Sequence, residues 1–124
     1  MTMQHYRSLD GLTLENTWLT VGVFDGVHRG HRQVLNKLTA GAHANGALAV
    51  VLTFDPRPAK VFGRGDIKLL TLPGERAKLL GELGVDTVIT HPFDRHVADI
   101  TAFDFMKKLK AQLDVRHLVL GYDS

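Results

Sequence analysis

The chain alternates short apolar runs with longer amphipathic ones. Residues 18–24 and 47–54 are almost continuously apolar, and the segment that follows the first run has apolar residues at helical spacing. Strands joined by helices of about ten or more residues need crossover connections, which favour parallel pairing. The pattern therefore predicts an α/β domain with a Rossmann-like parallel sheet and helices on both faces.

The other elements follow from apolar spacing and from residues that start or end helices. Strands are expected at residues 18–24, 47–54, 85–90 and 117–121, with a short edge strand within 5–9. One helix is expected from about Arg32, a second opens at Pro73 and a third begins at Thr101, where Asp104 suggests a capping box. Their expected apolar sides are formed by Val34, Leu35, Leu38 and Ala42; by Ala77, Leu79, Leu80 and Leu83; and by Phe105, Met106, Leu109 and Leu113. Asn45-Gly46 and Gly84 are expected to end the first two helices.

Residues 22–31, Gly-Val-Phe-Asp-Gly-Val-His-Arg-Gly-His, lie where the first strand should give way to a helix. Parallel sheets bind ligands at this end of their strands, and a helix N-terminus presents free N–H groups to anions. The glycines allow close approach of the backbone. His28 and His31, one helical turn apart, can each donate a hydrogen bond to a phosphate oxygen. The turn therefore predicts a phosphate site.

Other interpretations of this turn stay open. The two histidines could be ordinary surface residues, or they could share a zinc ion, although cysteines and an obvious third ligand are missing. The sequence does not support a P-loop kinase, because it has no Gly-x4-Gly-Lys-Ser/Thr segment. Residues 63–65, Gly-Arg-Gly, follow no expected strand and lack the third glycine of a dinucleotide fingerprint.

The composition of the chain and the lengths of its apolar runs argue against several classes of protein. The net charge of +2 is too small to argue for nucleic acid, and no block of lysines and arginines supports it. Without cysteines the chain forms no disulfides. No apolar run reaches the ~18 residues of a membrane span, and the N-terminus does not read as a signal peptide. A cytoplasmic location is expected. His91 and His96, in the loop after the third strand, are expected at the surface.

Two motifs carry a resemblance to a known family. The turn is similar to the Gly-x-Phe-Asp-x-x-His-x-Gly-His signature of the nucleotidyltransferase superfamily. With Gly26 and Val27 before His28, it resembles the N-terminal FMN adenylyltransferase (FAD synthetase) module of bacterial bifunctional riboflavin kinase/FAD synthetases. Residues 53–58, Thr-Phe-Asp-Pro-Arg-Pro, resemble that family's Thr-Phe-Asp-Pro-His-Pro element, and the resemblance spans essentially the whole chain.

The resemblance implies a two-sided substrate site. Its ATP side would consist of Gly22, Phe24, Asp25, His28, Gly30, His31, Gly121 and Asp123, with His28 and His31 as the catalytic residues. Its flavin side would consist of Phe54, Asp55, Pro56, Arg57, Pro58 and Phe62. Phe24 could instead be core at the end of the strand, the prolines could stiffen the loop, and Phe62 could anchor it. Arg57, where the family usually has histidine, could pair with the FMN phosphate.

The implied reaction converts ATP and FMN to FAD and diphosphate, a step of FAD biosynthesis. The implied partners are these small molecules, with no nucleic acid and no membrane. Mg²⁺ would arrive with the triphosphate and be held mostly by phosphate and water, with no dedicated protein site. Two alternatives remain: another nucleotidyltransferase of the superfamily, similar to pantetheine-phosphate adenylyltransferase, or a non-catalytic nucleotide- or flavin-binding fragment.

The resemblance also bears on domain extent. Residues 1–124 are expected to form an incomplete FAD synthetase domain, with its C-terminal part missing and the riboflavin kinase domain absent. A missing strand and helix would leave apolar sheet surface uncovered, and such surface is expected to allow self-association.

Overall fold

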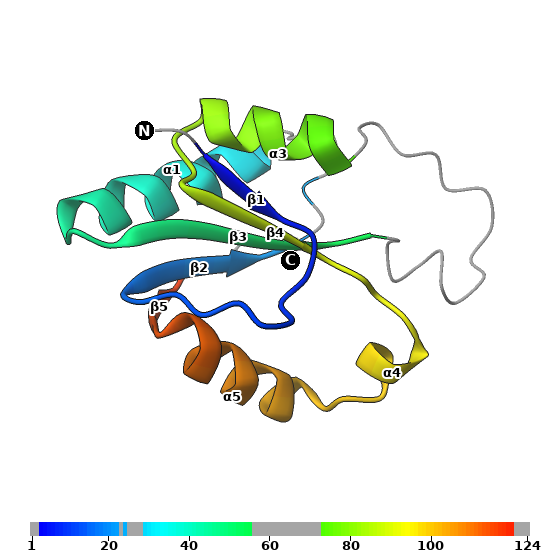
Figure 1. The fold of residues 1–124 in the computed structure, drawn as a ribbon. Coiled ribbons are helices and arrows are strands. Elements are labelled where there is room, and N and C mark those ends of the chain that lie inside the picture. Colours follow the sequence, from blue (N-terminus) through cyan, green and yellow to red (C-terminus); the bar gives the residue numbers. More distant parts are fainter. Residues whose placement is uncertain (1–2, 23, 25–28, 56–72, 121–124) are drawn as a thin grey trace.

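The computed structural model describes residues 3–22, 24, 29–55 and 73–120, and its centre is a parallel β-sheet (Figure 1). Its five strands are β1 (Gln4–Tyr6), β2 (Thr17–Val21), β3 (Leu48–Phe54), β4 (Thr87–His91) and β5 (Val115–Leu118), in the order β1-β4-β3-β2-β5. The helices are α1 (Arg29–Ala44), α3 (Pro73–Glu82), α4 (Arg95–Ala98) and α5 (Ala102–Leu113). All four strand pairings are parallel. The predicted Rossmann-like sheet is therefore confirmed.

Helices cover both faces of the sheet, as predicted. Figure 1 shows α1 and α3 over one face and α5 over the other. Along β3, Ala49 and Val51 pack in the core on the side of α1 and α3. Val50 and Leu52 pack in the core on the side of α5. All four are fully buried, as expected of a strand covered on both sides. No helix among the described residues is both long enough and apolar enough to cross a bilayer.

The strand order creates one switch point in the sheet. The chain proceeds from β2 to β3 to β4 in one direction and then returns, through α4 and α5, to place β5 on the other side of β2. The crevice between the carboxyl ends of β2 and β5 is where open parallel sheets bind their ligands. The turn that follows β2 therefore begins at this crevice.

Several strand boundaries differ from those predicted, for local reasons. The first strand ends at Val21 rather than at Phe24, because Phe24 has a left-handed φ of 55° that no strand accommodates. The expected fourth strand, 117–121, is β5, which starts earlier because Asp114 turns the chain directly from α5 into the strand. The third strand is shifted to 87–91, since the Val85 N–H bonds back to α3. The edge strand within 5–9 is β1 at 4–6.

Most of the predicted helix boundaries are confirmed. Gly46 and Gly84 have φ values of 66° and 100°, which glycine adopts readily, and they follow α1 and α3. The Thr101 side chain accepts a hydrogen bond from the Asp104 N–H at the start of α5. The first helix begins at Arg29, earlier than expected, and α4 was not predicted at all.

The expected apolar sides of the helices are confirmed except at one position. The buried members are Leu35, Leu38 and Ala42 of α1, Ala77 and Leu80 of α3, and Leu109 and Leu113 of α5, while Val34, Leu83, Phe105 and Met106 are partly buried. Leu79 was expected to face the core but is 37% exposed.

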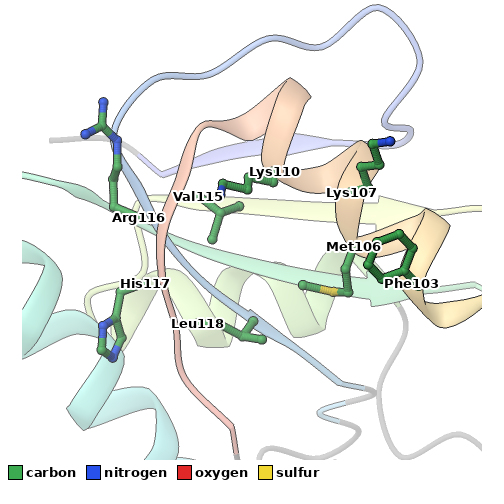
Figure 2. A pocket seen from close by; sticks show the side chains of 8 residues that line it. All are labelled: Phe103, Met106, Lys107, Lys110, Val115, Arg116, His117 and Leu118. Carbon is green, nitrogen blue, oxygen red and sulfur yellow. The ribbon is translucent and has the colours of Figure 1, made fainter.

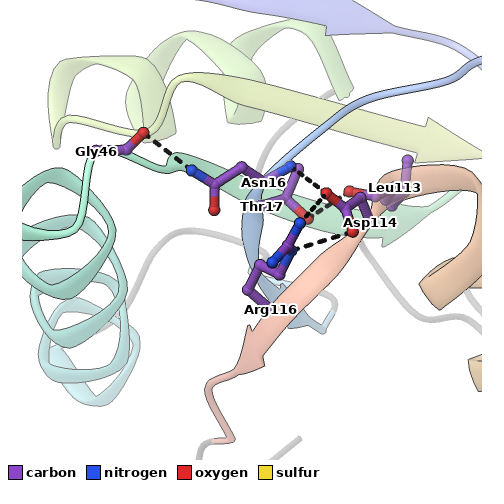
Figure 3. A network of polar contacts seen from close by, with 6 residues as sticks. All are labelled: Asn16, Thr17, Gly46, Leu113, Asp114 and Arg116. Atoms are coloured by element: carbon purple, nitrogen blue, oxygen red, sulfur yellow. Dashed lines mark hydrogen bonds and ion pairs between the residues drawn. The ribbon is translucent and has the colours of Figure 1, made fainter.

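A polar network joins the amino ends of β2, β3 and β5. It consists of Asn16, Thr17, Gly46, Leu113, Asp114 and Arg116 (Figure 3). The buried Thr17 hydroxyl donates to the Leu113 carbonyl at 2.8 Å, and the Asp114 carboxylate accepts from the Asn16 N–H at 2.8 Å. Hydrogen bonds from the Arg116 side chain, and then from the Asn16 backbone, lower the pKa of Asp114. The network holds β5 in register beside β2.

His91 lies in the sheet rather than at the surface, so its expected position was wrong. It is the last residue of β4 and is 7% exposed. Its Nδ1 accepts a hydrogen bond from the Leu9 N–H at 3.0 Å. This bond holds the segment after β1 against the end of β4. Burial lowers the pKa of His91, because the charged imidazolium would lose hydration there. His96, in α4, is exposed as expected.

Stability is expected to fall as the pH drops below the ordinary histidine pKa of 6.5. Folding lowers the pKa of His91, so the unfolded chain binds more protons in the window below 6.5 and is favoured there. Thermal unfolding at about pH 7.5 and about pH 5.5 would measure this. His91→Asn offers a non-titrating acceptor for the Leu9 N–H and should lose less stability on acidification. Equal losses in both proteins would contradict the role of His91.

Candidate nucleotide site at the carboxyl edge of the sheet

The start of α1 has the features of an anion site. The helix begins at Arg29, just after the β2 turn, so its first N–H groups lie at the carboxyl edge of the sheet. Its first turn contains no acidic side chain that would neutralise the positive end of the helix. Gly30 and His31 are its second and third residues, and the His31 side chain is half-buried. An anionic ligand is therefore favoured electrostatically at this end.

Phe24 supports His31 from the core side. Its side chain is only 5% exposed and belongs to the core beneath α1 and α3. The Phe24 and His31 ring centroids are 5.0 Å apart, with an interplanar angle of 61°. The ring also folds over Gly22, where an added Cβ would lie 2.8 Å from Phe24 Cε2. Gly22 thus makes room for Phe24, and Phe24 in turn fixes one side of His31.

The left-handed backbone of Phe24 is strained for a residue with a side chain. Such a conformation costs on the order of 1–3 kcal/mol and persists only where the surroundings stabilise it. Here burial of the ring provides that stabilisation. The alternative that Phe24 is core at the strand end is confirmed, and the same ring reaches a predicted catalytic residue.

Phe54 and Asp55 lie at the end of β3, next to β2. The Gly22 N–H donates to the Leu52 carbonyl at 3.0 Å, so the two strand ends are held together. The half-buried Phe54 ring packs on the α5 side of the sheet, with centroids 5.4 Å from Phe93 and 6.2 Å from Phe105. The Asp55 side chain is exposed, and its N–H donates to the carbonyl of His91.

Arg76 is a buried cation that the sequence analysis missed. It is 1% exposed, and its Nη1 donates to Thr53 Oγ1 at 3.0 Å. The signal was present in the helical spacing, because Arg76 lies one turn before the buried Leu80 on the same side of α3. No role was assigned to this arginine from the sequence.

The remaining predicted site residues lie outside the described part of the chain. These are Asp25, His28, Pro56, Arg57, Pro58, Phe62, Gly121 and Asp123. Among the described residues, the structure brings Gly22, Phe24 and His31 into one group, with Phe54 and Asp55 on the neighbouring strand end.

Within that described part, no three His, Asp or Glu side chains cluster so that they could hold a metal ion. A Mg²⁺ ion that arrives with a triphosphate needs no protein cage, since phosphate and water supply most of its ligands.

A separate groove lies between α5 and the outer edge of β5 (Figure 2). Its volume is about 500 Å³, and its walls are formed by Phe103, Met106, Lys107, Lys110, Val115, Arg116, His117 and Leu118. Phe103 is 76% exposed, and Leu120, which follows β5, is 68% exposed. None of the predicted site residues that the structure describes lines this groove.

Gly22→Ala is expected to destabilise the protein by roughly 1–3 kcal/mol, because the new methyl group overpacks against the Phe24 ring. Urea unfolding followed by circular dichroism would measure the change. The matched control is Gly74→Ala in α3, where the added Cβ would come no closer than 3.7 Å to another side chain. A Gly22→Ala protein as stable as the control would show that the ring does not depend on this space.

Comparison with known proteins agrees with this arrangement. A family model described as FAD synthetase matches residues 12–124. The bifunctional riboflavin kinase/FMN adenylyltransferase of Listeria monocytogenes is 32% identical over 123 residues, which cover 98% of this chain and 39% of that protein. The Escherichia coli K12 protein of the same name is 38% identical over 111 residues, covering 88% of this chain and 36% of that protein. The chain thus spans about two fifths of these curated relatives.

A likeness among solved structures concerns the fold alone. The crystal structure of a macrolide-efflux protein from Streptococcus pneumoniae superposes with a TM-score of 0.76, covering 96% of this chain and 40% of the other, at 20% identity.

Three observations identify the family of this chain. They are the glycine-rich turn in the sequence, the position of that turn at the switch point of a parallel sheet, and the family match over nearly the whole chain. This chain belongs to the FAD synthetase family.

Proposed function

We propose that this chain carries the FMN adenylyltransferase activity of its family, converting ATP and FMN to FAD and diphosphate. The observation that carries the proposal is His31 in the first turn of α1, at the switch point of the sheet and braced by the buried Phe24 ring. Family membership over residues 12–124 and the names of the relatives support the choice of substrates.

In the proposed reaction, an oxygen of the FMN phosphate attacks the α-phosphorus of ATP. The bond from that phosphorus to the oxygen bridging to the β-phosphorus breaks, and diphosphate leaves. No covalent intermediate on the protein is required, so catalysis consists of positioning the reactants and stabilising charge. Hydrogen bonds from His28 and His31, together with the N-terminus of α1, would stabilise the charge that develops on the phosphate oxygens.

The two sides of the proposed site follow from adjacent strand ends. ATP would lie over the turn after β2, with Gly22, Phe24, Asp25, His28, Gly30 and His31, and reach Gly121 and Asp123. FMN would lie beyond β3, with Phe54, Asp55, Pro56, Arg57, Pro58 and Phe62. The pairing of β2 with β3 supports this arrangement, because it sets the two strand ends side by side. Mg²⁺ would enter with the triphosphate, and the reaction would take place in the cytoplasm.

The purified chain is expected to release diphosphate and form FAD when ATP and FMN are both present. His31→Ala should slow both by about a hundredfold or more, because a donor to the transition-state charge is lost. Chromatographic detection of FAD and an enzymatic diphosphate assay would measure this. His43→Ala, at the exposed end of the same helix, is the matched control and should keep its rate.

Two outcomes would contradict the proposal. Diphosphate release with phosphopantetheine in place of FMN would indicate another nucleotidyltransferase of the superfamily. Binding of FMN and ATP without turnover would indicate a nucleotide- and flavin-binding fragment. Quenching of flavin fluorescence on addition of the chain distinguishes the second outcome from a complete absence of FMN binding.

We also propose that the chain self-associates through the outer edge of β5. Among the described residues, β5 pairs only with β2; the exposed Phe103 lines a groove with residues of β5, and the exposed Leu120 follows the strand by two residues. Sedimentation velocity over a range of concentrations should show a dimer that Phe103→Ser weakens. Leu79→Ser, on α3 at the other face of the sheet, is the control and should leave it unchanged. A monomer at every concentration would contradict this part of the proposal.

A further inference from the structure

Arg76 is the largest fully buried side chain among the described residues, and it carries a charge. Burying a guanidinium loses the hydration of its charge, and a well-packed apolar side chain at such a position is often at least as stable. Packing of α3 against the sheet therefore does not by itself explain an arginine here. Its contacts point to a second role.

The guanidinium connects the end of β3 to the first turn of α3. Arg76 belongs to the first turns of α3, which begins at Pro73, and its Nη1 donates to Thr53 Oγ1 at 3.0 Å. Thr53 is fully buried and is the penultimate residue of β3. The bond therefore joins the end of β3 to the first turn of α3.

The end of β3 is held on both faces of the sheet and from both neighbouring strands; from β2, the Gly22 N–H donates to the Leu52 carbonyl at 3.0 Å. On the α5 side of the sheet, the Phe54 ring packs against Phe93 and Phe105. From β4, the carbonyl of His91 accepts the Asp55 N–H at 3.2 Å. On the α3 side, Arg76 holds Thr53. Because Arg76 is itself buried, this contact restrains the position of the Thr53 side chain.

We propose that Arg76 is a positioning residue for FMN, an inference that rests on the function proposed above. By holding Thr53, its guanidinium fixes the backbone from which Phe54 and Asp55 extend toward the flavin side. Arg76 acts through Thr53 and need not touch the substrate. Its loss should therefore weaken the flavin side of the site selectively and leave the ATP side, built on β2 and α1, intact.

Separate measurements of FMN and ATP binding test this inference. The dissociation constant of FMN is measured by flavin fluorescence quenching and that of ATP by calorimetry, for the unmodified chain and for its variants. Arg76→Met should weaken FMN binding about tenfold and change ATP binding by less than about twofold. Arg76→Lys should recover part of the loss. Thr53→Val removes the hydroxyl that accepts from Arg76 and keeps the shape of the side chain, so it should weaken FMN binding in the same direction but less.

The effects of substituting Arg76 and Thr53 on FMN binding should not add. Combining Thr53→Val with Arg76→Met should weaken FMN binding no more than Arg76→Met alone, because both substitutions remove one interaction. Lys78→Met is the matched control, since this exposed cation belongs to the same helix and is in none of the contacts described above. It should leave both dissociation constants unchanged.

Several results would overturn the inference. Unchanged FMN binding by Arg76→Met would do so, as would equal weakening of FMN and ATP, which a general structural role predicts. If circular dichroism shows that Arg76→Met does not fold, Thr53→Val decides: binding of FMN as tight as in the unmodified chain rejects the inference. An unmodified chain that binds no FMN contradicts the proposed function itself, which separates the two failures.

Discussion

The pairing of β5 with β2 is the contact on which the rest of this structure depends. By returning to the far side of β2, the chain places α5 on the opposite face from α1 and α3, so that both faces are buried. The same return creates the switch point at the carboxyl ends of the two strands. The Thr17 hydroxyl and the Asp114 carboxylate fix this pairing at the opposite end of the strands, away from the candidate site.

The candidate site rests on the core between the sheet and helices α1 and α3. Phe24 and Arg76 are both buried on the side of the sheet covered by α1 and α3, at neighbouring strand ends. Phe24 contacts His31, and Arg76 contacts Thr53. For a reaction that depends on positioning rather than on a protein nucleophile, such supports decide how well the reactants are aligned.

The predicted elements were accurate where the pattern was local and strong. The continuous apolar run of β3, the glycines after α1 and α3 and the Thr101 cap depend on neighbouring residues, so periodicity and capping rules revealed them. Strand ends were less accurate. Nothing in the composition of residues 18–24 shows that Phe24 turns left-handed, because its ring is held there by contacts with Gly22 and His31.

Two of the buried polar residues, His91 and Arg76, show the same limit. His91 and Arg76 look like surface residues in the sequence, yet their partners, Leu9 and Thr53, are distant along the chain. Burial of such groups becomes favourable only once a hydrogen-bonding partner is brought to them.

By itself the sequence determined the α/β alternation, the family and the turn at which phosphate chemistry is expected, because these depend on residue type and short spacing. The tertiary structure alone decided the strand order, the side of β2 on which β5 lies and the burial of Phe24, His91 and Arg76. Those properties depend on contacts between residues far apart in the chain, which short-range spacing does not encode.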